Sequence, residues 1–215
     1  MAYIGKSPAV AALTASDITD GIVSNAKLAQ DIISADTALA VTPATTDELL
    51  LSDAGTLKRI DYSVIAGVTE ADMWRLTANL TSSADPITSN LERVDDASFE
   101  KIGTGMTVSS GVWTFPSTGL WSVIMNIEGE TSGSGQDTTM SITINNSAYD
   151  EVGVANAYGT DNDATSNVLE TYANVTDVAN VKVKFKTVLA SGSLLKGDTA
   201  RNETIFKFIR LGASQ

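Results

Sequence analysis

The chain has 215 residues, of which 43% are hydrophobic, and its formal net charge is −12. This length and composition predict a folded domain with a smaller additional segment, and the acidic balance without a basic stripe argues against nucleic acid as a partner. Histidine and cysteine are both absent, which excludes Ser-His-Asp hydrolases, thiolate nucleophiles and metal centres built on imidazole or thiolate ligands.

The start of the chain and the placement of its aromatic residues indicate how it is organised. The first residues, MAYIGKSPAVAAL, lack the long apolar core of a secretory signal, and no run of about 18 apolar residues follows that would span a bilayer. Only Tyr3 and Tyr62 precede residue 71 among the aromatic residues, so the large core-filling side chains come later. We predict an N-terminal arm over residues 1–70 and a main domain over residues 71–215.

The arm contains short apolar pieces separated by turn-forming residues. Ser24 is a candidate N-cap for a two-turn helix over residues 25–31, and residues 49–51 are expected to pair with residues 57–60 across a turn that contains Gly55. A flexible linker is one interpretation of this composition. The spacing of the aliphatic residues favours an anchor that packs on other copies of the chain or on another protein. The candidate anchoring residues are Ile18, Ile22, Leu28, Ile32 and Leu49.

The main domain shows the alternation of strands, without a helical period between them. The expected strands cover residues 74–80, 91–94, 106–115, 120–127, 140–144, 151–155, 167–172, 181–188 and 204–211. Short strands separated by polar turns predict an all-β fold, an antiparallel β-sandwich of the jelly-roll type. Within it, GVWTFPSTGLWSVIMNIEGE (residues 111–130) alternates on both sides of a Pro-Ser-Thr-Gly connector, which predicts a hairpin.

Two strands carry further information. VKVKFKTV places Lys182, Lys184 and Lys186 on one face, which we interpret as the solvated side of an edge strand protected by lysine; a binding ladder for acidic glycans is the alternative. TIFKFIRL is apolar on both sides, with isoleucines on one and Phe206 and Phe208 on the other. A strand that is apolar on both faces must be buried on both, either in the middle of a closed layer or against another subunit. For a sandwich whose outer face should meet water, the second option implies an oligomer.

Adjacent carboxylates are the remaining candidates for chemistry. The pairs are Asp95-Asp96, Asp150-Glu151 and Asp161-Asn162-Asp163. Neighbouring residues of a strand point to opposite faces, so the first two are poor acid/base pairs, and DNDATSN lacks the glycine and distal glutamate of a calcium loop. We therefore expect no enzyme activity, no cofactor and no metal site.

Loop residues are the candidate recognition elements. Tyr149, Tyr158 and Tyr172 are expected at loop tips, where aromatic rings can stack on sugars. The loops over residues 131–137 and 156–167 are the candidate receptor loops, and their acidic members include Asp161 and Asp163. The alternative is that these rings are buried and only their hydroxyls meet water.

The run FEKIGTGMTVSSGVWTFPSTGLWSVIMNIEGE (residues 99–130) resembles the complement globular-head and tumour-necrosis-factor-like jelly rolls. Phe115, Pro116, Gly119 and Trp121 match the aromatic-Pro-x-x-Gly-x-aromatic turn of that superfamily, and TIFKFIRLG resembles its terminal strand near the three-fold axis. The resemblance covers about residues 72–212 and implies a homotrimer. The candidate trimer-interface residues are Trp121, Ile205, Phe206, Phe208 and Ile209.

The arm has a resemblance of its own. DGIVSNAKLAQDI and TPATTDELLLSDAGTLKRIDYS resemble segments of marine bacteriophage tail-fibre and other virion appendage proteins, which implies a location in the virion. The resulting hypothesis is a homotrimeric bacteriophage virion structural protein, a capsid decoration or head fibre anchored on other virion proteins by its arm. The short chain and its lack of a repeating shaft favour the head, and a tail fibre or receptor-binding protein is the first alternative. A secreted carbohydrate-binding jelly roll is the second.

Overall fold

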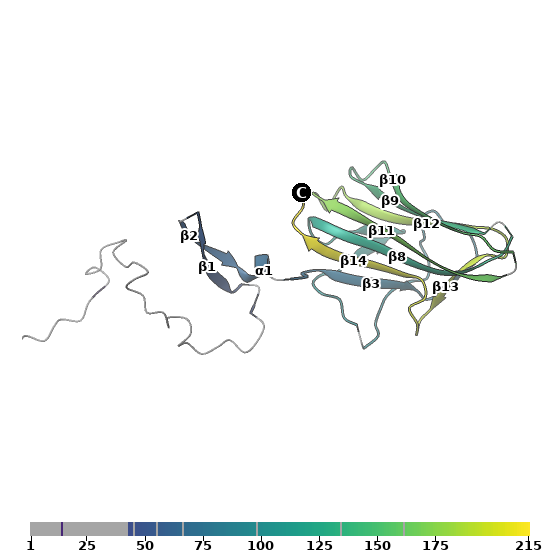
Figure 1. Cartoon of the computed structure of the whole chain (residues 1–215), viewed down its shortest axis with the longest axis horizontal. Coiled ribbons are helices and arrows are strands. Elements are labelled where there is room, and N and C mark those ends of the chain that lie inside the picture. The colour runs from purple at the N-terminus through teal and green to yellow at the C-terminus, as the bar shows by residue number, and fades with distance from the viewer. Residues whose placement is uncertain are drawn as a thin grey trace, which may run out of the picture. The chain divides into compact units, whose positions relative to one another are not determined.

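The computed structural model of the chain describes residues 14, 43–44, 46–54, 56–65, 67–97, 99–133, 135–160 and 162–215. The chain divides into two compact units, residues 1–62 and 63–215, so their boundary falls before the predicted one at residue 70 (Figure 1). The predicted helix over residues 25–31 lies outside the described residues, as do four of the candidate anchoring residues, Ile18, Ile22, Leu28 and Ile32. No helix in the described part of the chain has the length and apolarity needed to cross a membrane.

The first unit contains a β-hairpin where the sequence predicts one. Strand β1 (Glu48–Asp53) pairs antiparallel with β2 (Thr56–Asp61), and a single helical turn, α1 (Tyr62–Ile65), follows. Ala54 in the turn has a positive φ of 48°. The prediction that residues 49–51 pair with residues 57–60 is confirmed.

The second unit is built from strands. They are β3 (Ala71–Leu76), β4 (Ala78–Leu80), β5 (Leu91–Arg93), β6 (Thr107–Ser109), β7 (Val112–Thr114), β8 (Gly119–Thr131), β9 (Gln136–Thr143), β10 (Asp150–Ala157), β11 (Asp163–Val175), β12 (Lys182–Leu189), β13 (Leu194–Asp198) and β14 (Ile205–Gly212). All the pairings between them are antiparallel. The predicted all-β antiparallel fold is confirmed, and β13 is a strand that the sequence pattern did not reveal.

The strands form two layers (Figure 1). The five-stranded sheet has the order β10-β9-β12-β7-β6, and the seven-stranded sheet has the order β4-β13-β8-β14-β3-β5, with β11 paired to β8. Strands β14 and β13 pair with successive parts of β8, and β11 pairs with β8 along its whole length. The long strand β8 is therefore the centre of the second sheet.

The predicted hairpin over residues 111–130 is wrong. Strand β7 pairs with β6 and β12, whereas β8 pairs with β11, β13 and β14, so the connector crosses from one sheet to the other. Phe115 and Trp121, at the two ends of this connector, pack with ring centroids 5.2 Å apart in the core. Alternation locates the strands correctly, but both strands turn their aromatic faces inward from opposite layers instead of pairing side by side.

The core between the sheets is an aromatic cluster. Trp113 lies 5.5 Å from Phe206 and 5.1 Å from Phe208 between ring centroids, and Phe185 packs against both phenylalanines. All four rings are fully buried. Because they come from β7 and β12 in one sheet and from β14 in the other, the cluster holds the two layers together.

A buried carboxylate ties the loop after β5 to the sandwich. Asp72 accepts hydrogen bonds from Arg93 Nε (2.9 Å) and Nη2 (3.0 Å), from Trp74 Nε1 (2.9 Å) and from the backbone N–H of Met106 (2.7 Å). These donors belong to β3, β5 and the segment just before β6. The carboxylate is therefore a structural centre and not a free acid.

We expect Asp72→Ala to lower the free energy of unfolding by about 3 kcal/mol, because a guanidinium, an indole N–H and a backbone N–H lose their acceptor together. Urea denaturation measures this change. Asp85→Ala is the matched control: its ion pairs with Lys184 and Lys186 are partly exposed, and we expect a cost below about 1 kcal/mol. Equal costs for the two variants would contradict the structural role of Asp72.

Candidate interaction surface

The outward face of the seven-stranded sheet is the candidate functional surface. Phe206 and Phe208 of β14 point into the core, so the alternating residues Ile205, Lys207 and Ile209 point outward. The register extends this face over four strands in three rows, which are Arg75, Ile205, Asn126 and Val168; Met73, Lys207, Ile124 and Glu170; and Ala71, Ile209, Ser122 and Tyr172. We call these residues the β14 face.

The β14 face is mainly apolar although it lies on the outside of the sandwich. Val168 is 59% exposed and Tyr172 is 64% exposed in the single chain, while Ile124 and Ile209 are half-buried. An antiparallel sheet with one solvated face normally alternates apolar-in with polar-out. Contiguous apolar side chains on such a face mark an interaction surface.

The charged residues of the β14 face are balanced. Arg75 is buried, and its Nη2 donates to Glu92 Oε1 (2.6 Å) and Asp95 Oδ1 (2.7 Å). Lys207 and Glu170 stand on either side of Ile124 in the middle row, with opposite charges on different strands. The face can therefore be covered by an apolar partner that also offers one group of each sign.

The structure corrects three of the predicted trimer-interface residues. Trp121, Phe206 and Phe208 are fully buried inside one chain and have no surface with which to touch another copy. Ile205 and Ile209 lie on the opposite side of β14, on the β14 face, but Ile205 is also buried within the single chain and only Ile209 is half-buried. The prediction that this strand is apolar on both sides is correct, but its aromatic side is the one that fills the sandwich.

Sequence reasoning also missed residues of this surface. The sequence predicts Tyr172 at a loop tip, but it lies within β11, three residues before the end of the strand, and on the β14 face. The signal was present in the alternation of Val168, Glu170 and Tyr172 along the strand. What the sequence lacked was the pairing that brings these residues beside Ile124 and Ile209.

The lysine ladder lies on a central strand, because β12 sits between β9 and β7; the prediction of an edge strand is wrong. Lys182 Nζ donates to Thr114 Oγ1 (3.0 Å) and to the carbonyl oxygen of Val178 (2.6 Å). Lys184 and Lys186 both form ion pairs with Asp85. Since all three ammonium groups have partners within the chain, the ladder is a poor site for an acidic glycan.

The candidate receptor residues are in different environments. Tyr149 is half-buried and lies beneath Lys184, whose Nζ is 4.9 Å from the ring centroid, while Tyr158 is exposed. Asp163 begins β11, and its Oδ2 accepts a hydrogen bond from the Thr160 N–H (3.2 Å); Asp161 lies outside the described residues. In the described part of the chain, no three acidic, histidine or cysteine side chains are grouped to hold a metal ion.

Burial raises the pKa of Tyr149, and the nearby positive charge of Lys184 lowers it by a smaller amount. We therefore expect Lys184→Ala to raise this pKa further, and Lys186→Ala, the matched control, to leave it unchanged. The pKa of Tyr149 in the folded chain lies above the unfolded value of about 10. The stability that Tyr149 contributes is therefore fully present below about pH 10, and it is lost as the pH rises through the folded pKa. Ultraviolet titration of the tyrosinates measures the shift, and a lower pKa in Lys184→Ala would contradict the arrangement.

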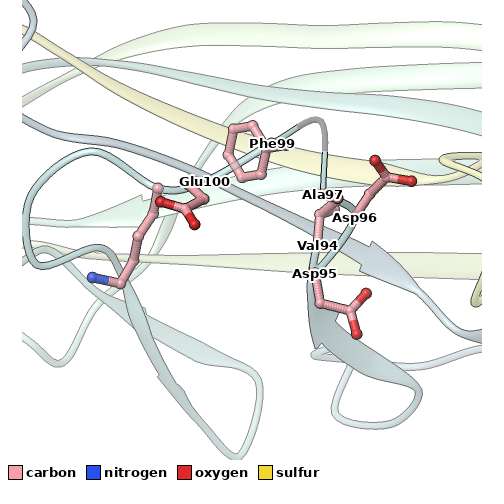
Figure 2. Close-up of a pocket in the computed structure, with 7 residues that line it drawn as sticks. Val94, Asp95, Asp96, Ala97, Phe99 and Glu100 are labelled. Carbon is pink, nitrogen blue, oxygen red and sulfur yellow. The ribbon is translucent and has the colours of Figure 1, made fainter.

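An open depression of about 400 Å³ follows β5 and is lined by residues 94–97 and 99–101. Figure 2 shows the carboxylates of Asp95 and Asp96 pointing in different directions. Asp95 is bound to Arg75, and Lys101 Nζ donates to the carbonyl oxygen of Gly103 (2.7 Å). The two adjacent carboxylates are not directed at a common point where they could act as an acid/base pair.

The chain matches no protein-family model, and no curated protein matches it. Solved structures share its fold. Eiger TNF from S. frugiperda aligns with a TM-score of 0.50 and 12% identity over 70% of this chain and 96% of that chain. Murine APRIL at pH 5.0 aligns with a TM-score of 0.52 and 8% identity over 66% of this chain and 98% of that chain. The PRD1 vertex protein P5 aligns with 17% identity over 69% and 100% of the two chains, but its TM-score of 0.43 is too low to support an inference. The first two alignments confirm the predicted jelly-roll fold, which this chain shares with both structures.

Proposed function

We propose that the chain is a homotrimeric virion structural protein whose jelly roll trimerises through the β14 face. The observation that carries this proposal is the apolar outward face itself, on which Val168 and Tyr172 are open to solvent in a single copy. A second copy of the chain is the partner that would cover the largest part of this surface in one contact. The tumour-necrosis-factor-like fold supports the same conclusion, because the sequence resemblance to that superfamily implies a trimer.

The charges on the β14 face fit a ring of three copies. In a cyclic trimer the contact is heterologous, so the β11 side of one copy meets the β14 side of the next. That contact brings Glu170 of one copy toward Lys207 of its neighbour, and the same pairing repeats at each of the three interfaces. Side chains on β3, β8 and β14 then lie nearest the axis, where the half-buried Ile124 and Ile209 are removed from water.

The location in a virion is supported by the resemblance of residues 14–63 to segments of virion appendage proteins. We place the trimer first as a capsid decoration or head fibre whose N-terminal arm attaches to another virion protein. A tail fibre or receptor-binding protein is the second candidate, and the exposed Tyr158 favours it because an uncovered aromatic ring beside a loop can contact a host surface glycan.

Sedimentation equilibrium of the purified chain tests the trimer, which requires three times the chain mass of 22.5 kDa. Gold-labelled antibodies against residues 63–215, applied to intact virions of the virus that encodes the chain, test the location. Label over the head supports a decoration, and label over the tail supports the second candidate. A purified protein with the mass of one chain would overturn the trimer, and unlabelled virions would overturn the location.

A further inference from the structure

The β1–β2 hairpin has leucines that nothing described within its own unit covers. Leu49, Leu50 and Leu51 are 46%, 74% and 50% exposed. The register places Leu49 opposite Ile60 and Leu51 opposite Lys58 on one face, and Leu50 opposite Arg59 on the other. We call the first of these the leucine face of the hairpin.

A hairpin of this kind needs a partner. Two strands alone are at best marginally stable in water. Leu49 and Leu51 are about half exposed, and removing their remaining apolar surface from water would stabilise the hairpin. The partner must present an apolar surface of similar width, because the leucine face is only two strands across.

The charges of the hairpin allow copies of it to approach one another. Lys58 pairs with Asp53, and Arg59 pairs with Glu48 Oε1 at 2.9 Å. Residues 48–61 contain three acidic and two basic side chains, a net charge of −1, compared with −12 for the whole chain. Repulsion between copies is therefore weak at this segment.

The proposed trimer would hold three hairpins close together. Residues 62–70 join the hairpin to β3, and nine extended residues span at most about 32 Å. Short connections of this kind give tethered groups effective concentrations in the millimolar range. A second copy of the hairpin is thus the apolar partner present at the highest concentration.

We propose that the three hairpins of the trimer pack their leucine faces together on the three-fold axis and form a second trimerisation element. Leu49, Leu51 and Ile60 of each copy then point to the axis, and Leu50 points away from it beside Arg59. This inference rests on the proposed trimer, but the contact it names is separate from the β14 face.

The absence of cysteine makes a direct test simple. The variants Leu51→Cys and Leu50→Cys each place one thiol on adjacent residues of β1, on the leucine face and on the opposite face. Each full-length variant is treated with a short-armed trifunctional maleimide and separated on a denaturing gel. We expect Leu51→Cys to give mainly a three-chain product and Leu50→Cys to remain a single chain. Both substitutions are at exposed positions, so neither should unfold the protein.

Sedimentation of the same two variants separates the two proposals. A trimer in which only Leu51→Cys links three chains supports the hairpin contact. A trimer in which neither variant links, or both link equally, overturns the hairpin contact and leaves the β14 face as the only trimer contact; a hairpin that docks on another virion protein gives this result. A single-chain mass overturns the trimer, and the hairpin contact with it.

Discussion

Phe208→Ala is expected to lower the free energy of unfolding by about 3–5 kcal/mol. Phe208 is fully buried, and its ring contacts Trp113, Phe115 and Phe185 in the cluster that joins the two sheets. Truncation removes the transfer energy of the ring and leaves a cavity that rigid neighbours from two layers cannot fill. Since domains of this size have about 5–15 kcal/mol of stability in total, the variant should lose a large share of it.

Lys207→Ala is the matched control for this variant. Lys207 precedes Phe208 in β14 but points outward, so its truncation should change the unfolding free energy by less than about 0.5 kcal/mol. Chemical denaturation at a concentration where the chain is monomeric measures both variants. If Phe208→Ala dissociated the assembly without destabilising the chain, Phe208 would be an interface residue after all.

The double variant Val168→Glu/Tyr172→Glu should convert the proposed trimer to single chains that keep their fold. Both side chains are exposed in one copy, so the fold has little to lose, but an assembled interface would have to bury the new carboxylates without partners. Leaving buried charges unpaired costs several kcal/mol per interface, which we expect to raise the dissociation constant by a factor of about 10³ or more. Sedimentation gives the mass, and circular dichroism gives the fold.

Val188→Glu is the corresponding change on the other sheet. Val188 is an exposed valine on β12, on the outer side of the five-stranded sheet, and we expect its variant to remain trimeric. A double variant that stays trimeric, or a control that dissociates equally, would place the interface away from the β14 face.

The strands could be predicted from the sequence because their apolar residues alternate, and alternation survives any arrangement of the strands. Residues 181–188 and 204–211 were placed almost at the bounds of β12 and β14. The β1–β2 hairpin could also be predicted, since its two strands are close in sequence and joined by a short turn. Pairing between strands distant in sequence could not be predicted, which is why the alternation wrongly predicts a hairpin over residues 111–130 and an edge position for β12.

The candidate surface was only half predictable for a related reason. A strand that is apolar on both sides must have two partners, but the pattern of β14 does not say which side is the core. The answer depends on volume: two phenylalanines fill the space beside Trp113 and Phe185, whereas isoleucines there would leave a cavity. Comparing the two sides of β14 in this way requires the positions of β7 and β12, which the sequence pattern does not give.

The separation of the two sheets of the jelly roll from the β1–β2 pair has a genetic consequence. Residues 48–61 form a two-stranded sheet of their own, and neither sheet of the second unit borrows a strand from them. A recombination break in the codons for residues 63–67 would therefore exchange one whole jelly roll for another without separating any pair of hydrogen-bonded strands. A gene that encodes such a chain could therefore acquire a new jelly roll in one crossover and retain the N-terminal segment that precedes it.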